Sequence, residues 1–258
     1  KGPKGTNVIL TVKRVNGTVE DVIIERDVVI LEESYAKSAI ISKNQKKFGL
    51  IELPKFYVDF QDYGERNAAS DVKKAIEQFK NNSIDGIVID LRNNGGGSLK
   101  TVVDMTGYFI DEGPVVQVKS TGGKKEVLED MDSSLIWDGP LVILVNEFSA
   151  SASEILAAAL QDYRRAIILG SPQTYGKGTV QNVIDLNRII AANQHGDLGA
   201  LKITTDKFYR INGGSTQLEG VKSDIVFPSR YNSIEIGEKD QPNPLGWDRI
   251  SPANYSSW

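Results

Sequence analysis

The chain of 258 residues contains no cysteine and a single histidine. The absence of cysteine excludes a disulfide framework, a thiol nucleophile, a zinc–thiolate site and an iron–sulfur cluster. One histidine cannot build a histidine-rich metal site, and a Ser-His-Asp triad would have to use His195. His195 lies in the polar stretch 193–197, where we expect a surface loop. We expect neither a metal nor another cofactor.

Long apolar runs and a strong charge of one sign are also missing. The longest apolar stretches are segments such as 141–145, far below the roughly 18 residues of a membrane span. With 30 basic and 34 acidic residues the net charge is −4, which argues against a nucleic-acid partner and a polybasic membrane anchor. The first residues lack both an initiator Met and the apolar segment of a signal peptide, so we expect a fragment or a processed form.

The apolar pattern predicts strands and helices in an order typical of an α/β fold. Residues 8–12 and 21–24 flank Asn16-Gly17, which predicts a β-hairpin. A strand is expected at 48–53, and a helix from Ser70 that ends at 81–83. The remaining expected elements are strands at 86–91, 141–145, 166–169, 179–184, 201–204, 207–211 and 225–227, and helices at 99–110 and 152–160.

The glycine-rich turn at residues 93–97 follows a predicted strand and precedes a predicted helix. Its three glycines let backbone N–H groups point into one space, where they can bind an anion or an oxyanion formed during acyl transfer. A flexible turn is the alternative, because glycine is a common turn residue. A dinucleotide motif would need glycine where Lys100 stands.

A second motif, residues 148–155, is rich in serine and alanine and joins a predicted strand to a predicted helix. A serine here can present its hydroxyl at a helix N-terminus, where the following N–H groups favour negative charge. The alternative is that Ser151 and Glu154 form a capping box, with Ser151 an ordinary N-cap.

A third motif, residues 174–181, holds Lys177 between two glycines and departs from a phosphate-binding loop at two positions. In a strand, Lys177, Thr179 and Gln181 share one face. The two glycines would allow a substrate backbone to approach closely. A lysine that acts as a general base must be neutral, hence desolvated and without a nearby carboxylate. The alternative is a solvated lysine on a turn.

A serine, a lysine and backbone donors are together the parts of a Ser–Lys acyl-transfer site. In these motifs the chain resembles the carboxy-terminal processing, or tail-specific, serine proteases. The matching segments run in family order over nearly the whole chain: 90–97, 148–154, 161–163, 176–181, 207–217 and 220–225.

The resemblance implies a role for each matched residue. It makes Ser151 the nucleophile, Lys177 the general base and Gln181 the residue that orients the lysine, with the backbone N–H groups of Ala152, Gly96 and Gly97 as oxyanion donors. It also implies the twisted α/β core of crotonase-like hydratases and Clp-type peptidases. The implied activity is endoproteolysis of extended polypeptides near their C-termini, in the periplasm or cell envelope.

Asp162 also matches a family position and invites a triad interpretation. In one helix that begins at Ser151, Asp162 would lie about 16 Å away along the axis, so we expect a structural role. The segment 170–175 is one residue longer than the family spacing. The PDZ domain that normally precedes the core is represented only by its apparent end, at residues 2–12.

We therefore expect three segments: a PDZ remnant with a β-rich linker at 1–45, the protease core at 46–229, and an extended tail at 230–258, packed by Trp247 and Trp258. A peptide-binding pseudo-protease without turnover is the alternative function. A crotonase-like acyl-CoA enzyme is a weaker one, because no carboxylate pair lies near the glycine turn.

Overall fold

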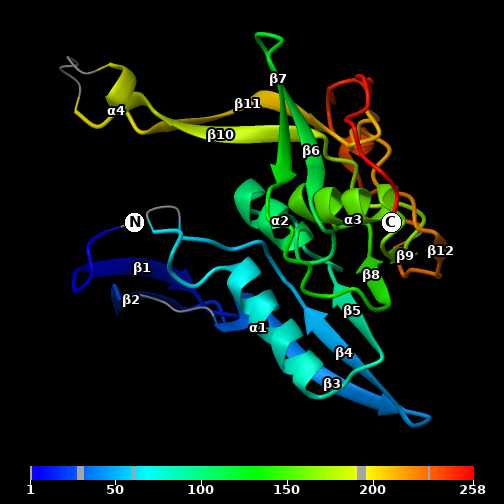
Figure 1. The fold of residues 1–258 in the computed structure, drawn as a ribbon. Coiled ribbons are helices and arrows are strands. Elements are labelled where there is room, and N and C mark those ends of the chain that lie inside the picture. Colours follow the sequence, from blue (N-terminus) through cyan, green and yellow to red (C-terminus); the bar gives the residue numbers. More distant parts are fainter. Residues whose placement is uncertain (1, 28–31, 60–61, 191–195, 232) are drawn as a thin grey trace. The chain divides into compact units, whose positions relative to one another are not determined.

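The computed structural model describes residues 2–27, 32–59, 62–190, 196–231 and 233–258 (Figure 1). The chain divides into two compact units, Lys1–Glu33 and Ser34–Trp258. The functional boundaries predicted near residues 45 and 229 stay predictions. His195 lies outside the described residues.

The first unit is an antiparallel hairpin of β1 (Asn7–Lys13) and β2 (Val19–Glu25). Gly17 adopts φ +89° in the connecting turn, a conformation that glycine reaches without strain. The predicted hairpin is therefore confirmed. A short 3-10 turn, η1 (Glu32–Ser34), follows.

The second unit is built around a six-stranded sheet with the order β12-β9-β8-β5-β4-β3. All neighbours pair in parallel except the antiparallel hairpin of β3 and β4. The strands are β3 (Lys37–Lys43), β4 (Lys46–Glu52), β5 (Gly86–Asp90), β8 (Leu141–Val145), β9 (Ile167–Gly170) and β12 (Ile225–Val226). The expected α/β core is confirmed, although β3, whose residues are all exposed, was not expected.

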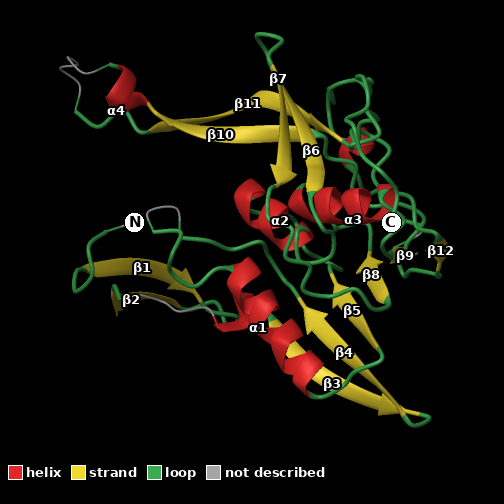
Figure 2. Cartoon of the chain, viewed as in Figure 1, coloured by secondary structure: helices red, strands yellow, loops and turns green. Residues whose placement is uncertain are grey.

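Three helices pack on the sheets (Figure 2): α1 (Ala68–Asn81), α2 (Leu99–Thr106) and α3 (Ala152–Asp162). The predicted apolar face of α1 is buried, and its N-cap is Asn67, whose Oδ1 accepts from Ser70 N at 2.9 Å. Helix α2 ends before the predicted residue 110, because Gly107 caps it.

A second, antiparallel sheet has the order β10-β11-β6-β7. Its strands are β6 (Gly113–Ser120), β7 (Lys125–Asp130), β10 (Thr179–Asp185) and β11 (Ala200–Tyr209), with the short helix α4 (Leu186–Ile189) after β10. Helices α2 and α3 contact β6, so they lie beneath this sheet (Figure 2). The two strands predicted at 201–204 and 207–211 form one strand, β11, and the β6–β7 hairpin was not expected.

Both tryptophans of the tail anchor it to the core, as expected. Trp247 Nε1 donates to Ser215 O at 2.9 Å, and Trp258 N donates to Tyr163 O at 2.8 Å. The Arg165 guanidinium lies 4.8 Å from the Trp258 ring centroid, within cation–π distance. The tail also holds a 3-10 turn, η2 (Glu238–Asp240).

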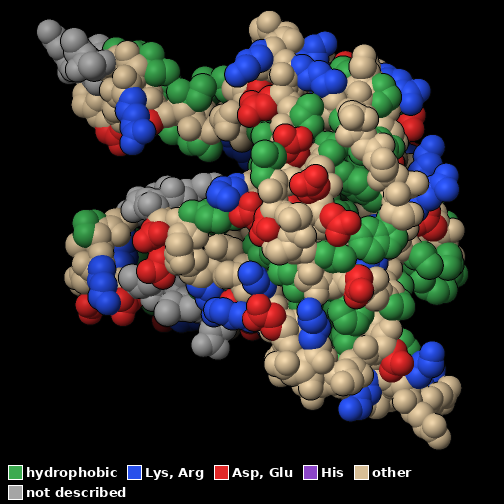
Figure 3. Space-filling view, in the orientation of Figure 1, with side chains coloured by type: hydrophobic (Ala, Val, Ile, Leu, Met, Phe, Trp, Pro, Cys, Tyr) green, Lys and Arg blue, Asp and Glu red, His purple; other side chains and the backbone are tan. Residues whose placement is uncertain are grey.

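Acidic and basic side chains are interspersed over the face seen in Figure 3, as the small net charge would suggest. Among the described residues, no helix has the length and apolarity needed to span a membrane.

Strand β9 gives a matched test of the core. Ile168 is 0% exposed and its neighbour Ile167 is 49% exposed, because successive side chains point to opposite faces. We expect Ile168→Ala to lower the free energy of unfolding by about 2–5 kcal/mol. The control Ile167→Ala should change it by roughly 0.5 kcal/mol. Urea titration measures both, and equal losses would contradict this assignment of faces.

Candidate active site

Two loops meet at the carboxyl ends of the central parallel strands β5 and β8. Residues 91–98 follow β5 and residues 146–151 follow β8, and these neighbouring strands run in the same direction. The loops are joined by Asn146, whose Oδ1 accepts from Asn93 N at 2.8 Å while its Nδ2 donates to Asn93 Oδ1 at 2.8 Å. The fold thus places the glycine turn beside the serine-rich segment.

The three serines of that segment have different environments. Ser149 Oγ donates to Leu91 O at 2.8 Å and Ser153 Oγ donates to Asn94 O at 2.8 Å, and both side chains are fully buried. These two hydroxyls hold the glycine loop. In the described structure the Ser151 hydroxyl donates no hydrogen bond, so its proton is the one available for chemistry.

Ser151 adopts a conformation that non-glycine residues rarely take, with φ +57° and ψ −114°. Such a conformation costs on the order of 1–3 kcal/mol and persists only where its surroundings hold it. Ser151 N donates to Glu154 Oε2 at 2.8 Å, which is the carboxylate half of the expected capping box. An ordinary N-cap lies in the extended region and bonds the helix through its hydroxyl. Ser151 and Glu154 therefore form the expected capping box, but the φ and ψ of Ser151 are not those of an ordinary N-cap.

Gly96 and Gly97 are required by close approach as well as by backbone conformation. Gly96 has φ +101°, and a Cβ there would lie 2.7 Å from Ser151 Cβ. Gly97 has φ +149°, and a Cβ there would lie 2.2 Å from Phe56 O. The turn therefore requires glycine at both positions, because a side chain at either one would displace neighbouring atoms.

The amides of this region are not equally available. Gly96 N already donates to Asn94 Oδ1 at 2.9 Å. In the described structure no hydrogen bond engages the N–H groups of Gly97 and of Ala152, the first residue of α3. Two amides are thus left to face a ligand.

Glu154, which is 0% exposed, joins the serine segment to the lysine segment. Its Oε2 accepts from Ser151 N at 2.8 Å and from Lys177 N at 3.0 Å. Its Oε1 accepts from Thr174 Oγ1 at 2.6 Å and Gly176 N at 2.7 Å. One side chain therefore fixes the backbones of both segments.

Burial is the dominant influence on the Glu154 carboxyl and raises its pKa to about 7, although the four hydrogen bonds act in the opposite direction. The folded protein therefore retains a proton on this group at pH values where the unfolded chain has lost it.

Lys177 is half-buried just before β10. Burial lowers the pKa of its ammonium, and the positive charge of Lys202 lowers it further, while Glu238 and Glu154 oppose these effects. The glycines on either side make room for the chain itself: a Cβ at Gly176 would lie 3.0 Å from the Leu218 carbonyl carbon, and one at Gly178 would lie 2.7 Å from Gln217 Cβ. This explains both glycines without any substrate.

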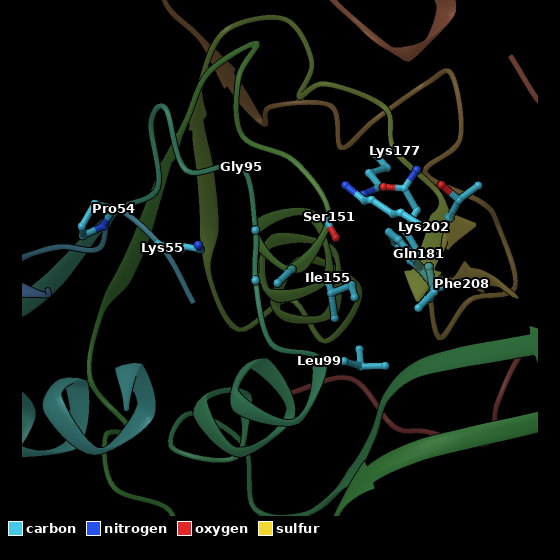
Figure 4. Close-up of a pocket in the computed structure, with 15 residues that line it drawn as sticks. Pro54, Lys55, Gly95, Leu99, Ser151, Ile155, Lys177, Gln181, Lys202 and Phe208 are labelled. Carbon is cyan, nitrogen blue, oxygen red and sulfur yellow. The ribbon is translucent and has the colours of Figure 1, made fainter. Parts of the chain in front are cut away.

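The residues that the sequence singled out line one pocket of about 410 Å³. Figure 4 shows Ser151 between the segment that carries Gly95 and the group formed by Lys177, Lys202 and Gln181. All six predicted site residues line this pocket: Gly96, Gly97, Ser151, Ala152, Lys177 and Gln181. In the described structure no hydrogen bond joins Ser151 Oγ or the Gln181 amide to Lys177 Nζ. Catalytic hydrogen bonds commonly tighten only when substrate is bound.

Asp162 lies at the far end of α3 from Ser151, as its spacing predicted. Its carboxylate accepts from Arg210 Nη2 at 2.6 Å and from Asn212 Nδ2 at 2.8 Å, so it has a structural ion pair. Among the described residues, no group of three or more His, Asp or Glu side chains could hold a metal ion.

Sequence reasoning missed several residues that build the site. Glu154 was noticed only as a cap, and its bond to Thr174 is invisible in the sequence because the two lie 20 residues apart. Lys55 and Lys202 also line the pocket, and no motif marked either of them. Only the fold brings these side chains together.

The sequence pattern of peptidase family S41 matches residues 47–227 of this chain. The chain belongs to this family. The match covers five strands of the six-stranded sheet, from all but the first residue of β4 to β12, together with the serine and lysine segments; β3 lies outside it.

Individual relatives agree with this assignment. The chain is 43% identical over 256 residues to the tail-specific protease of Haemophilus influenzae, covering 99% of this chain and 35% of that protein. It is 32% identical to the carboxy-terminal-processing protease of Bartonella bacilliformis, covering 92% of this chain and 51% of that protein. Among solved structures, the photosystem II D1 C-terminal processing protease has the same fold, with a TM-score of 0.63, 24% identity, and coverage of 88% of this chain and 56% of that one. The chain thus spans a third to about half the length of these curated relatives.

Glu154 should make the stability of the protein depend on pH. Its pKa is about 7 in the folded protein and 4.5 for an unperturbed glutamate, so its contribution is fully present below pH 4.5 and is lost as the pH rises through 7. In Glu154→Gln this contribution to the slope of the free energy of unfolding against pH should disappear. The difference in slope from the unmodified chain should approach about 1.4 kcal/mol per pH unit between these values.

Urea titrations from pH 4.5 to 8 measure this slope. The control Glu77→Gln removes an exposed carboxylate on α1 and should retain the slope of the unmodified chain. Identical slopes for the unmodified chain and Glu154→Gln would show that Glu154 does not carry the effect.

Proposed function

We propose that this chain is the catalytic part of a serine endopeptidase with a Ser–Lys dyad, which cleaves polypeptides near their C-termini. The observation that carries the proposal is the shared pocket. It holds the strained Ser151, whose hydroxyl donates no hydrogen bond in the described structure, the half-buried Lys177 and two unengaged amides. Membership of peptidase family S41 supports the same chemistry.

In the proposed acylation step, neutral Lys177 accepts the proton of Ser151 Oγ as the oxygen attacks the scissile carbonyl carbon. Lys177 then donates that proton to the leaving amine, and the acyl-enzyme forms. A water that loses a proton to Lys177 hydrolyses the ester and releases Ser151. Gln181, which lines the same pocket on β10, would orient the lysine amine once substrate is bound.

The oxyanion would be held by the amides of Ala152 and of the glycine turn. Gly97 N is better placed for this than Gly96 N, because Asn94 Oδ1 already engages the Gly96 amide. Ala152 N adds the favourable dipole of the first turn of α3. Removal of one such donor typically costs roughly 3 kcal/mol of transition-state stabilisation.

Substrate is proposed to bind as an extended strand. Strand β10 is at the edge of its sheet, and Thr179, Val180 and Gln181 at its beginning line the pocket. Main-chain hydrogen bonds to an edge strand accept many sequences, which suits cleavage of varied polypeptides.

The place of this chain in a larger protein is also a proposal. We assign residues 1–45 to the end of a PDZ domain and its linker, 46–229 to the protease core and 230–258 to an extension. By family resemblance we place the protein in the periplasm or cell envelope of a bacterium, with envelope polypeptides as substrates. Two of the relatives above are bacterial proteases named for tail-specific or carboxy-terminal processing.

Substitution of the dyad tests the proposal directly. We expect Ser151→Ala and Lys177→Ala each to reduce cleavage of casein, an unstructured polypeptide, by about three orders of magnitude or more. The reason is that no other described side chain in the pocket supplies a nucleophile and a base in these positions. Gel electrophoresis and release of a fluorescent label measure the rate, and circular dichroism checks that the variants remain folded.

Lys124→Ala is the matched control, because it removes an exposed lysine from the β6–β7 turn and should cleave normally. Full activity in either dyad variant would contradict the mechanism. An unmodified chain that binds casein without cutting it would instead support the peptide-binding alternative.

The pH profile tests the base separately. Because the pKa of Lys177 is lowered from 10.5, chiefly by burial, kcat/KM should rise with pH as the amine loses its proton and level off below pH 10.5. EDTA and thiol-alkylating reagents should leave the rate unchanged. A rate that falls on chelation, or a kcat/KM that falls with rising pH in the range where the amine loses its proton, would argue against a lysine base.

A further inference from the structure

The pocket around Ser151 contains more positive charge than a single general base requires. Its lining residues include Lys55, Lys177 and Lys202 but no aspartate or glutamate, in a chain whose net charge is −4. In the described structure neither Lys55 nor Lys202 forms an ion pair or a side-chain hydrogen bond. A base that has to be neutral therefore shares its pocket with two exposed lysines that have no ion-pair partner in the described structure.

Lys202 lies on the same side of the pocket as the lysine base. It belongs to β11, where it pairs with Val183 of β10, and Gln181 pairs with Thr204. Side chains two residues apart on a strand point to the same face, so Lys202 shares a face with Gln181. Figure 4 shows Lys202 beside Lys177 and Gln181, whereas Lys55 lies across the glycine segment.

We propose that Lys202 is a positioning residue that acts through charge: its ammonium holds Lys177 in the neutral form that can accept the Ser151 proton. The inference rests on the proposed function, in which Lys177 is the general base. It adds a residue that neither the motifs nor the family resemblance marks.

Charges of both signs face Lys177 from other elements, and Lys202 opposes the two carboxylates among them. Glu154 on α3 and Glu238 on η2 both favour the charged amine, while burial and Lys202 on β11 favour the neutral one and lower its pKa. Lys55 adds a positive charge from the opposite wall. Without Lys202, two carboxylates would act on Lys177 with burial to oppose them.

Direct titration of Lys177 tests the inference without any need for activity. The full chain, with Ser151→Ala and lysine labelled with 13C at Cε, is titrated by NMR, and the Lys177 signal is assigned by its loss in Lys177→Arg. In Lys202→Gln the midpoint of the Lys177 titration should move to higher pH. It should stay in place in Lys202→Arg, which keeps the charge, and in Lys124→Gln, which removes a distant one. An unmoved midpoint in folded Lys202→Gln overturns the inference.

Kinetics supply a second readout that a merely structural role would not move. In Lys202→Gln, kcat/KM on the acid limb should fall by roughly two- to tenfold, while the alkaline plateau is retained. Added salt should shift the acid limb of the unmodified enzyme to higher pH by screening Lys202, and this shift should shrink in Lys202→Gln.

Two kinetic outcomes would overturn the inference. One is an equal loss at every pH. The other is a raised KM with an unmoved acid limb, which would mean that Lys202 binds an anionic group of the substrate instead. A chain that cleaves nothing would contradict the proposed function alone, because the NMR titration would still decide the effect of Lys202.

Discussion

The site depends on one buried carboxylate. Glu154 has no exposed surface, and a charge in such a position is tolerated only when hydrogen bonds replace its water. Its four bonds reach the backbones of Ser151, Gly176 and Lys177 and the Thr174 hydroxyl. The strained conformation of Ser151 and the position of the lysine segment are therefore fixed by the same side chain. A change at Glu154 would release both at once.

The parallel sheet supplies the second constraint. Because β5 and β8 end at the same edge, the glycine loop and the serine loop lie side by side, and buried side chains bond each to the other. Ser149 and Ser153 donate to Leu91 O and Asn94 O, so two of the three neighbouring serines hold the scaffold. The third, Ser151, is left at the pocket. The repetition of serine thus combines two structural roles with the chemical role that we propose for Ser151.

The pattern of apolar residues predicted those strands and helices that are stabilised mainly by burial of an apolar face. Continuous apolar runs predicted β5, β8 and β9, and the spacing of apolar residues predicted α1, because burial against the core dominates there. The mostly exposed strands β3 and β7 carry no such pattern. They form strands because they pair with β4 and β6, respectively. In the site, the motifs located Ser151 and Lys177. They could not show that Lys202 enters the pocket, because only the fold brings this distant segment to the site.

The way in which Glu154 binds Lys177 explains how the lysine that we propose as the base can lie near a carboxylate. A carboxylate paired with the ammonium would stabilise its charged form and raise its pKa. Here Glu154 accepts from the backbone N–H of Lys177 at 3.0 Å, not from Nζ, so it positions the residue through the main chain. Its through-space effect on the amine is the smallest of the contributing influences, and burial is the largest. Glu154 thus fixes the position of Lys177 through its backbone N–H, while burial and the positive charge of Lys202 lower the pKa of its side-chain amine.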